Sequence, residues 1–166
     1  MITPDYIQLM ARYSAWQNSS LMETCGQVAP DALHADQGLF FGSIFATLNH
    51  LLWGDRIWMH RFAGTPQPRQ ASITDSVQET PDWAHFMVER MACDQAIQGW
   101  AAQITPERLA GELTWHSASV GRDITKPMAF LVVHFFNHQT HHRGQVHGAL
   151  TSLGAKPGAT DVFLIP

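Results

Sequence analysis

Four long segments of the chain carry their apolar residues in a pattern typical of helices that bury one face. The first segment covers about residues 4–25, with a proline suited to its first turn and Gly26 suited to its end. The second runs from residue 42 or 43 to about residue 62, and Gly64 and Pro66 stop it. The polar stretch that follows, GTPQPRQASITDSVQ, is rich in turn residues and therefore predicts a loop.

The third segment opens with residues that are typical of a helix start. Thr80 is placed to cap the helix, Pro81 suits its first position, and Asp82 is favourable at the positive end of the helix dipole. This helix is expected to continue to about residue 104. Residues 112–125, ELTWHSASVGRDIT, alternate weakly between apolar and polar and contain a glycine, which predicts a short β-hairpin or an extended excursion.

The fourth segment begins at Lys126-Pro127 and ends near Leu153-Gly154. The tail after it is rich in turn residues, and its apolar residues 162–165 are expected to pack back on the helices. Four long helices with few strands predict an all-α fold, a four-helix bundle with the hairpin or extended excursion just before the last helix. A chain of 166 residues without a repeat or a linker predicts one domain, residues 1–166.

Five of the ten histidines lie within fourteen residues of the fourth predicted helix, in HFFNHQTHHRGQVH. Each helical residue advances by about 100°, so the apolar residues of this segment mark the face toward the core. His142 falls within that apolar stripe and His138 lies at its edge. His134 and His141 lie on the flank, and His147 points away. The histidines expected to face the interior are therefore those at positions 138 and 142.

These two histidines have the i, i+4 spacing that places their side chains one turn apart on one face of a helix. Such a pair can converge on one metal ion, because Zn–N bonds of about 2.0–2.1 Å need ligands from neighbouring turns. The same spacing fits two core histidines that hydrogen bonds satisfy, and spacing alone leaves both interpretations open. The HExxH motif of zinc proteases is absent.

Two histidines rarely hold a metal alone, so a third ligand should come from another helix. The second predicted helix offers His50, which lies among apolar residues where an unpartnered ring is costly to bury. This side chain either binds metal or donates to a backbone carbonyl, and helical geometry does not decide between the two. His60 lies beside Arg61 near the helix end, where solvation and the dipole explain it. Surface or structural roles are expected for His34, His85 and His116.

Other metal architectures fit the sequence less well. A di-iron bundle needs paired ExxH motifs with further glutamates on facing helices, and this chain has five glutamates, none of them in such a motif. The CxxCH motif of attached haem is also absent. A mononuclear site made of histidines remains the candidate.

The charge balance limits the classes of partner that the protein can bind, and the cysteines indicate the cellular compartment. Charged residues make up 14 % of the chain, the net charge is −4, and Lys and Arg are scattered, which argues against a nucleic-acid partner. Two cysteines without a CxxC pair suit a reducing cytoplasm. The N-terminal residues lack the apolar core of a signal peptide, and no uncharged apolar run approaches the ~18 residues that span a membrane. A cytoplasmic protein without a membrane partner is expected.

Several motifs, in the same order along nearly the whole chain, resemble the DinB/YfiT-like family of four-helix-bundle metalloenzymes. They are YSAWQN in the first helix, LNHLLWGDRIW in the second, NHQTHHRGQVHGALTSLG in the fourth and the closing TDVFLIP. The resemblance implies one divalent metal ion, held by a histidine of the second helix and an HxxxH pair of the fourth. In this chain these are His50, His138 and His142. The family is often dimeric, which suits the low charge content and implies a homodimer.

The resemblance also implies a chemistry. Three neutral imidazoles leave positions open on a metal for water or substrate, as in catalytic sites. Relatives of known activity use low-molecular-weight thiols, so a small-molecule substrate and a thiol-dependent S-transferase of detoxification or stress response are expected. A metal-binding stress protein without turnover and a metal-dependent hydrolase are the alternatives. Imidazole ligands accept zinc, nickel or iron, so the sequence leaves the metal unidentified.

The motifs contain further residues whose roles the sequence leaves open. Asp55 falls on the inner stripe of its helix. It is a candidate general base, a residue that supports a metal ligand, or a buried hydrogen-bond acceptor. His134 and His141, on the flank of the last helix, are the other candidates for a general base. For Arg143 and Gln145 an anchoring role at neighbouring helix ends or the hairpin is favoured over contact with substrate. Gly144 costs a helix roughly 1 kcal/mol relative to alanine, which predicts the close approach of a neighbouring helix. Pocket lining or core packing would explain Trp53, Trp58 and Trp115.

Overall fold

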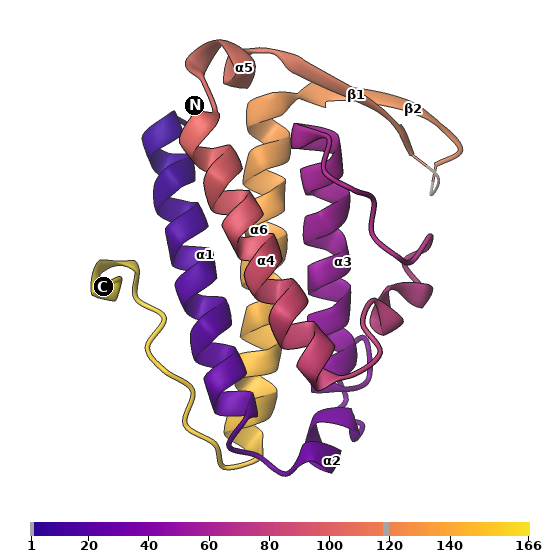
Figure 1. Ribbon diagram of the computed structural model, residues 1–166, viewed down its shortest axis with the longest axis vertical. Helices are drawn as coiled ribbons and strands as arrows, with labels where there is room; N and C mark the ends of the chain where they lie inside the picture. Colours follow the sequence, from indigo (N-terminus) through magenta and orange to yellow (C-terminus); the bar gives the residue numbers. More distant parts are fainter. Residues whose placement is uncertain (1, 118–119) are drawn as a thin grey trace.

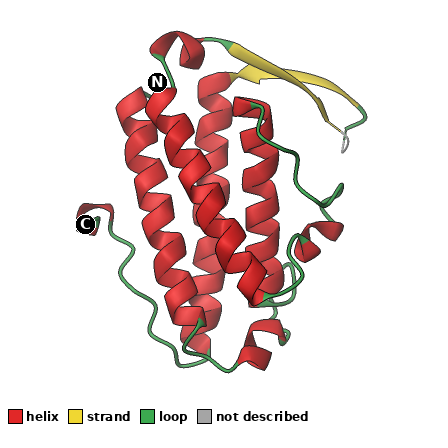
Figure 2. Ribbon diagram, in the orientation of Figure 1, coloured by secondary structure: helices red, strands yellow, loops and turns green. Residues whose placement is uncertain are grey.

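The computed structural model describes residues 2–117 and 120–166, and its main feature is a bundle of four long helices (Figure 1 and Figure 2). These helices are α1 (Pro4–Cys25), α3 (Ile44–Ala63), α4 (Trp83–Gln103) and α6 (Met128–Ser152). α1 packs against α4 and α6, and α3 packs against the same two helices. The structure therefore confirms the predicted all-α four-helix bundle.

Shorter elements connect the long helices. They are α2 (Pro30–His34), the 3-10 helices η1 (Asp75–Gln78) and η2 (Val162–Leu164), α5 (Pro106–Ala110), and the strands β1 (Glu112–Ser117) and β2 (Arg122–Pro127). The two strands pair antiparallel, so the predicted hairpin before the last helix is confirmed. It leaves the bundle at the start of α6 and extends past the end of α3 (Figure 2). Between α3 and α4, η1 packs against α3, so the predicted loop holds a short helix.

The boundaries of α3 follow from ordinary capping. The side chain of Ser43 accepts a hydrogen bond from the backbone nitrogen of Ala46 at 3.1 Å, which satisfies one donor of the first turn. At the other end Gly64 adopts a left-handed backbone with φ of 69°, and its nitrogen donates to the carbonyl of His60. Residues with a side chain rarely adopt that conformation, which explains why the helix ends there.

The predicted start of α4 was wrong by two residues. Asp82 is the N-cap, and its side chain accepts from the backbone nitrogen of His85 at 2.9 Å. Thr80 is buried instead, and both its backbone nitrogen and its hydroxyl donate to Oδ1 of Asn49, at 2.7 and 2.8 Å. A tertiary contact with α3 thus withdraws the threonine from the capping position that its sequence context suggested.

The prediction for the C-terminal tail was also wrong. Phe163 is 84 % exposed, and its apolar neighbours Val162 and Leu164 are exposed as well. The tail is attached to α1 through its backbone: the hydroxyl of Tyr13 donates to the carbonyl of Thr160 at 2.8 Å. The final apolar residues therefore lie outside the core.

The centre of the bundle contains a polar network surrounded by apolar side chains. Asp55 of α3 accepts from Arg90 of α4 at 2.7 Å and from Gln139 of α6 at 3.0 Å. Arg90 also pairs with Asp94 at 2.8 Å, and Asn18 of α1 donates to Asp94 at 2.9 Å. The network therefore joins all four long helices and gives partners to charged groups that would be costly to bury alone. Within the described part of the chain, no helix combines the length and apolar character that crossing a bilayer requires.

Candidate metal centre

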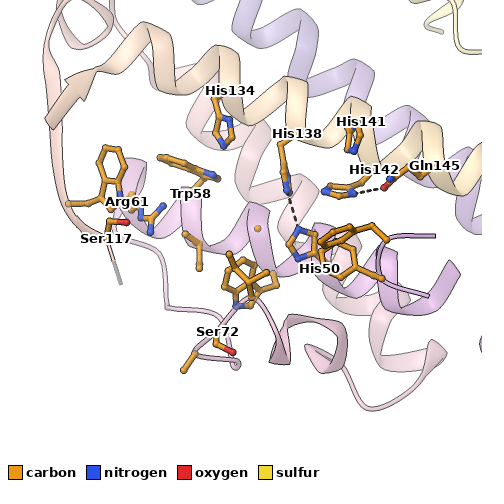
Figure 3. A pocket seen from close by; sticks show the side chains of 18 residues that line it. His50, Trp58, Arg61, Ser72, Ser117, His134, His138, His141, His142 and Gln145 are labelled. Carbon is orange, nitrogen blue, oxygen red and sulfur yellow. Dashed lines mark hydrogen bonds between the residues drawn. The ribbon is translucent and has the colours of Figure 1, made fainter. Parts of the chain in front are cut away.

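Three histidine side chains from two helices converge at one end of a cavity (Figure 3). His50 comes from the middle of α3, and His138 and His142 come from successive turns of α6. One ring nitrogen of each lies within 4.8 Å of the others. The structure thus brings together the three residues that the sequence singled out.

The hydrogen bonds of His50 determine which ring nitrogen is free. Its Nδ1 lies 2.8 Å from the hydroxyl oxygen of Ser76, at η1. That hydroxyl donates its own hydrogen to the carbonyl of Ile73 at 2.6 Å, so it must accept the hydrogen of the imidazole. The hydrogen of His50 is therefore on Nδ1, and the Nε2 lone pair faces the cluster.

His142 is oriented in the same way by its own helix. Its Nδ1 lies 2.7 Å from Oε1 of Gln145, one turn further along α6. An amide oxygen only accepts, so Nδ1 of the imidazole carries the hydrogen and Nε2 keeps its lone pair. Gln145 thus orients a candidate ligand, a role more specific than the structural anchor that the sequence suggested.

His138 completes the cluster from a position next to the backbone of α3. Its Nε2 lies 3.2 Å from Nε2 of His50. Two nitrogens on one tetrahedral zinc ion are separated by about 3.3 Å when each bond is about 2.05 Å, so the observed separation suits a shared metal ion. The Nδ1 atom of His138 is buried and has no hydrogen-bond partner among the described residues.

The backbone at Gly54 provides the space for the ring of His138. A Cβ atom at this position would lie 2.8 Å from Cε1 of that ring, closer than carbon atoms approach without a clash. In contrast, a Cβ at Gly144 would have no described neighbour within 4 Å, so the predicted close helix approach there was wrong. The glycine that permits a close approach lies in α3.

Burial keeps the clustered rings neutral. Burial, and after it the neighbouring His142, lowers the pKa of His50 to about 4. The same two causes in the same order lower the pKa of His138 to about 3. Burial also lowers the pKa of His142, against the opposing effect of its bond to Gln145. Neutral imidazole is the form that binds a metal ion, so the donor set suits a divalent cation.

The cluster lies in the wall of a cavity of about 940 Å³ that is lined mainly by apolar and aromatic side chains. Phe41 stacks on the ring of His50, with ring centres 4.0 Å apart. Trp53 and Trp58 of α3 and Trp115 of β1 form further parts of the wall, so these tryptophans line a pocket. No acidic residue occurs among the described side chains of the lining. The hairpin and the segment around η1 thus enclose space that the bundle alone would leave open.

The remaining histidines lie outside the cluster. His134 and His141 line the same cavity beside the cluster, consistent with the flank position predicted for them. His60 is bonded through Nδ1 to the carbonyl of Thr65 at 2.6 Å, beyond the end of α3. The others lie elsewhere: His34 on α2, His85 on α4, His116 on β1 and His147 on the part of α6 that faces α1.

Asp55 and Arg143 have no direct part in the cluster. Asp55 is fully buried in the polar network, and burial raises its pKa against the opposing effect of Arg90. It acts as a buried hydrogen-bond acceptor and does not reach the cavity. Arg143 is also buried, with its guanidinium carbon 5.6 Å from the centre of the Tyr13 ring, which agrees with a structural role.

Sequence reasoning missed two residues that shape the cluster, Ser76 and Gly54. Ser76 lies in a stretch that was interpreted as an ordinary loop, and nothing in the local sequence connects it with His50. Gly54 lies within the motif LNHLLWGDRIW, where a glycine inside a helix was the only available signal.

One of three comparisons with known proteins finds a match. A sequence model described as the DinB family matches residues 1–166, the whole chain. A comparison with curated proteins found no match, and neither did a comparison with solved structures.

Proposed function

The chain belongs to the DinB family, and from that premise we propose that His50, His138 and His142 together bind one divalent metal ion that serves a reaction in the adjoining cavity. The observation that carries the proposal is the convergence of three neutral imidazoles, two of which, His50 and His142, have an Nδ1 hydrogen bond that turns Nε2 inward. If the histidines of α6 were only core residues satisfied by hydrogen bonds, their ring nitrogens would not need to converge with that of His50 on one point.

The position of the cluster favours a catalytic site over a closed structural one. Structural zinc sites have four protein ligands, whereas catalytic sites have three and leave a position for water or substrate. Here the described residues supply three donors, and no acidic residue or cysteine lines the cavity as a fourth. The open side of the cluster faces a space large enough for a small molecule.

We propose further that the reaction is a thiol-dependent S-transfer. A divalent ion on three imidazoles would lower the pKa of a thiol that reaches it and so favour the nucleophilic thiolate. The protein has no thiol of its own for this step, because Cys25 and Cys93 are buried away from the cavity and burial raises the pKa of each to about 12. The thiol must therefore come from a second small molecule. The apolar walls suit the carbon skeleton of its electrophilic partner.

Elemental analysis of protein purified without a histidine tag tests the metal proposal. We expect about one zinc, nickel or iron ion per chain, with loss of that ion in His142→Ala and in His50→Ala. His60→Ala is the matched control, since it removes another histidine of α3 that is bonded outside the cluster. Metal uptake that survives His142→Ala would contradict the proposal.

Turnover is tested separately with the metal-loaded protein. A panel of cellular thiols is offered with 1-chloro-2,4-dinitrobenzene, whose chloride departs as the sulfur–carbon bond forms. We expect thiol-dependent product, lost with a chelator and restored by zinc. Ester hydrolysis without thiol would favour the hydrolase instead, and stoichiometric metal without any turnover would favour a metal-binding protein that is not an enzyme.

The homodimer implied by the family resemblance is part of the same proposal. Val88 and Met91 lie one turn apart on the outer side of α4 and are 63 % and 51 % exposed, which would suit a helix covered by a second copy. Light scattering at micromolar concentration measures the mass directly. A monomer at every concentration would contradict this part of the proposal.

A further inference from the structure

Among the described side chains that line the cavity beside the histidine cluster, that of Arg61 alone carries a permanent charge. This arginine belongs to the last turn of α3, eleven residues after His50, which corresponds to about 16 Å along the helix axis. Figure 3 shows it at the end of the cavity that lies away from His142. A space lined by aromatic rings thus has a cluster of nitrogen donors at one end and a cation at the other.

Two tryptophans hold the guanidinium group of Arg61. Its central carbon lies 4.6 Å from the centre of the Trp58 ring and 5.4 Å from that of Trp115. Stacking on indole faces leaves the N–H groups at the edge of the guanidinium plane available to donate. The planar fork of these donors matches a carboxylate, with two parallel hydrogen bonds.

No described carboxylate of the protein pairs with Arg61, in contrast to its neighbours. Arg56, five residues earlier on α3, forms ion pairs with Glu79 and Glu89. Arg90 in the bundle pairs with Asp55 and Asp94. Burial lowers the pKa of Arg61, because nothing acidic offsets the cost of holding the cation away from water. The fold therefore holds a half-buried cation in the cavity wall that no carboxylate of the described residues pairs with.

We propose that Arg61 is an anion subsite that selects apolar carboxylic acids, with the carboxylate on the guanidinium group and the apolar body along the aromatic wall. This inference rests on the proposed function for the identity of the reacting end, which would lie at the three histidines. The ring of His134 lies between the two ends, with its centre 5.3 Å from that of Trp58 and 6.0 Å from that of His138. A substrate that reaches both ends is therefore extended along the aromatic wall.

Isothermal titration of the metal-free protein with 2-naphthoate and with 2-naphthamide tests the subsite. The two probes share the apolar body and differ in charge, and without metal the carboxylate has only the protein to bind. We expect the acid to bind at least about tenfold more tightly than the amide, because a charge-assisted bidentate pair replaces a neutral contact. Arg61→Gln should abolish that preference and leave the affinity for the amide unchanged.

Arg12→Gln is the matched control, since Arg12 is exposed on α1 and lies outside the cavity lining. It should retain the preference for the acid. Equal binding of acid and amide by the unsubstituted protein overturns the inference without any variant, as does a preference that survives in Arg61→Gln. Metal uptake is measured on the same preparations, so a protein that prefers the acid but takes up no metal contradicts the proposed function and leaves the anion subsite standing.

Discussion

The backbone of α3 at Gly54 leaves the space that the ring of His138 occupies, and filling that space should separate metal binding from folding. In Gly54→Ala the new Cβ would meet Cε1 of the ring at 2.8 Å. An ordinary carbon–carbon contact is about 3.5–4.0 Å, so the ring must move by about 0.7–1.2 Å. Metal ligands tolerate about 0.2 Å, and the displacement therefore exceeds what a shared metal ion accepts.

The same substitution should leave the fold intact or make it more stable. The atom that must give way belongs to a side chain, whereas alanine in a helix is favoured over glycine by about 1 kcal/mol. We therefore expect zinc affinity to fall by at least about tenfold, with an unfolding free energy equal to or above that of the parent. Zinc affinity is measured by competition with a chromogenic chelator, and stability by urea unfolding of the metal-free protein.

Gly144→Ala provides the matched control, because a Cβ there would have no described neighbour within 4 Å. It should show the gain in helix stability and unchanged zinc affinity. Zinc affinity in Gly54→Ala equal to that of the parent would refute the placement of His138 in the metal site. A large loss of stability would refute the view that the ring can move without disturbing the bundle.

Three further predictions concern residues around the cluster and in the core. Ser76→Ala should weaken zinc binding about tenfold in the chelator competition, because His50 loses the acceptor that holds the hydrogen on its Nδ1. Unchanged zinc affinity would show that this hydrogen bond does not orient the ring. Asp55→Ala should lower the urea unfolding free energy by about 3 kcal/mol or more, because Arg90 loses a buried partner; a loss below about 1 kcal/mol would contradict the importance of the network. Burial raises the pKa of Cys25 and Cys93 from 9.0 to about 12. As the pH rises, the thiols of the unfolded chain therefore lose their protons before those of the folded protein. The stability that each neutral thiol contributes is lost between pH 9 and pH 12. From about pH 9 to about pH 10.5, the unfolding free energy of the parent should therefore fall by roughly 1 kcal/mol per pH unit more than that of Cys93→Ala. Parallel pH profiles of the two proteins would contradict this prediction.

Local sequence was sufficient for the helices and for two of the three histidines of the cluster. The segments that became α1, α3 and α6 were predicted within about two residues at each end, because apolar spacing and capping residues act within a few positions. The i, i+4 spacing selected His138 and His142 for the same reason. His50 was selected only through the family resemblance, since the helical pattern of α3 did not distinguish it.

The predictions for the start of α4 and for the C-terminal tail were wrong because contacts between residues far apart in the sequence determine the structure there. Thr80 looked like an N-cap, but it bonds to Asn49, thirty-one residues earlier. The C-terminal apolar residues were expected in the core, but side chains of α1 donate hydrogen bonds to backbone carbonyls of the tail and hold it with Phe163 exposed. Neither outcome follows from residue types over a few positions.

The sequence by itself determined the bundle and the pair of histidines on one face of α6, because the spacing of apolar residues within a segment shows which side chains share a face of a helix. Tertiary structure decided which nitrogens point inward, through Ser76 and Gln145, and which backbone leaves room for a ring, at Gly54. It also enclosed the cavity and brought Trp115 of the hairpin over Arg61. These features depend on distances between segments far apart in the chain, and such distances are set only when the helices pack.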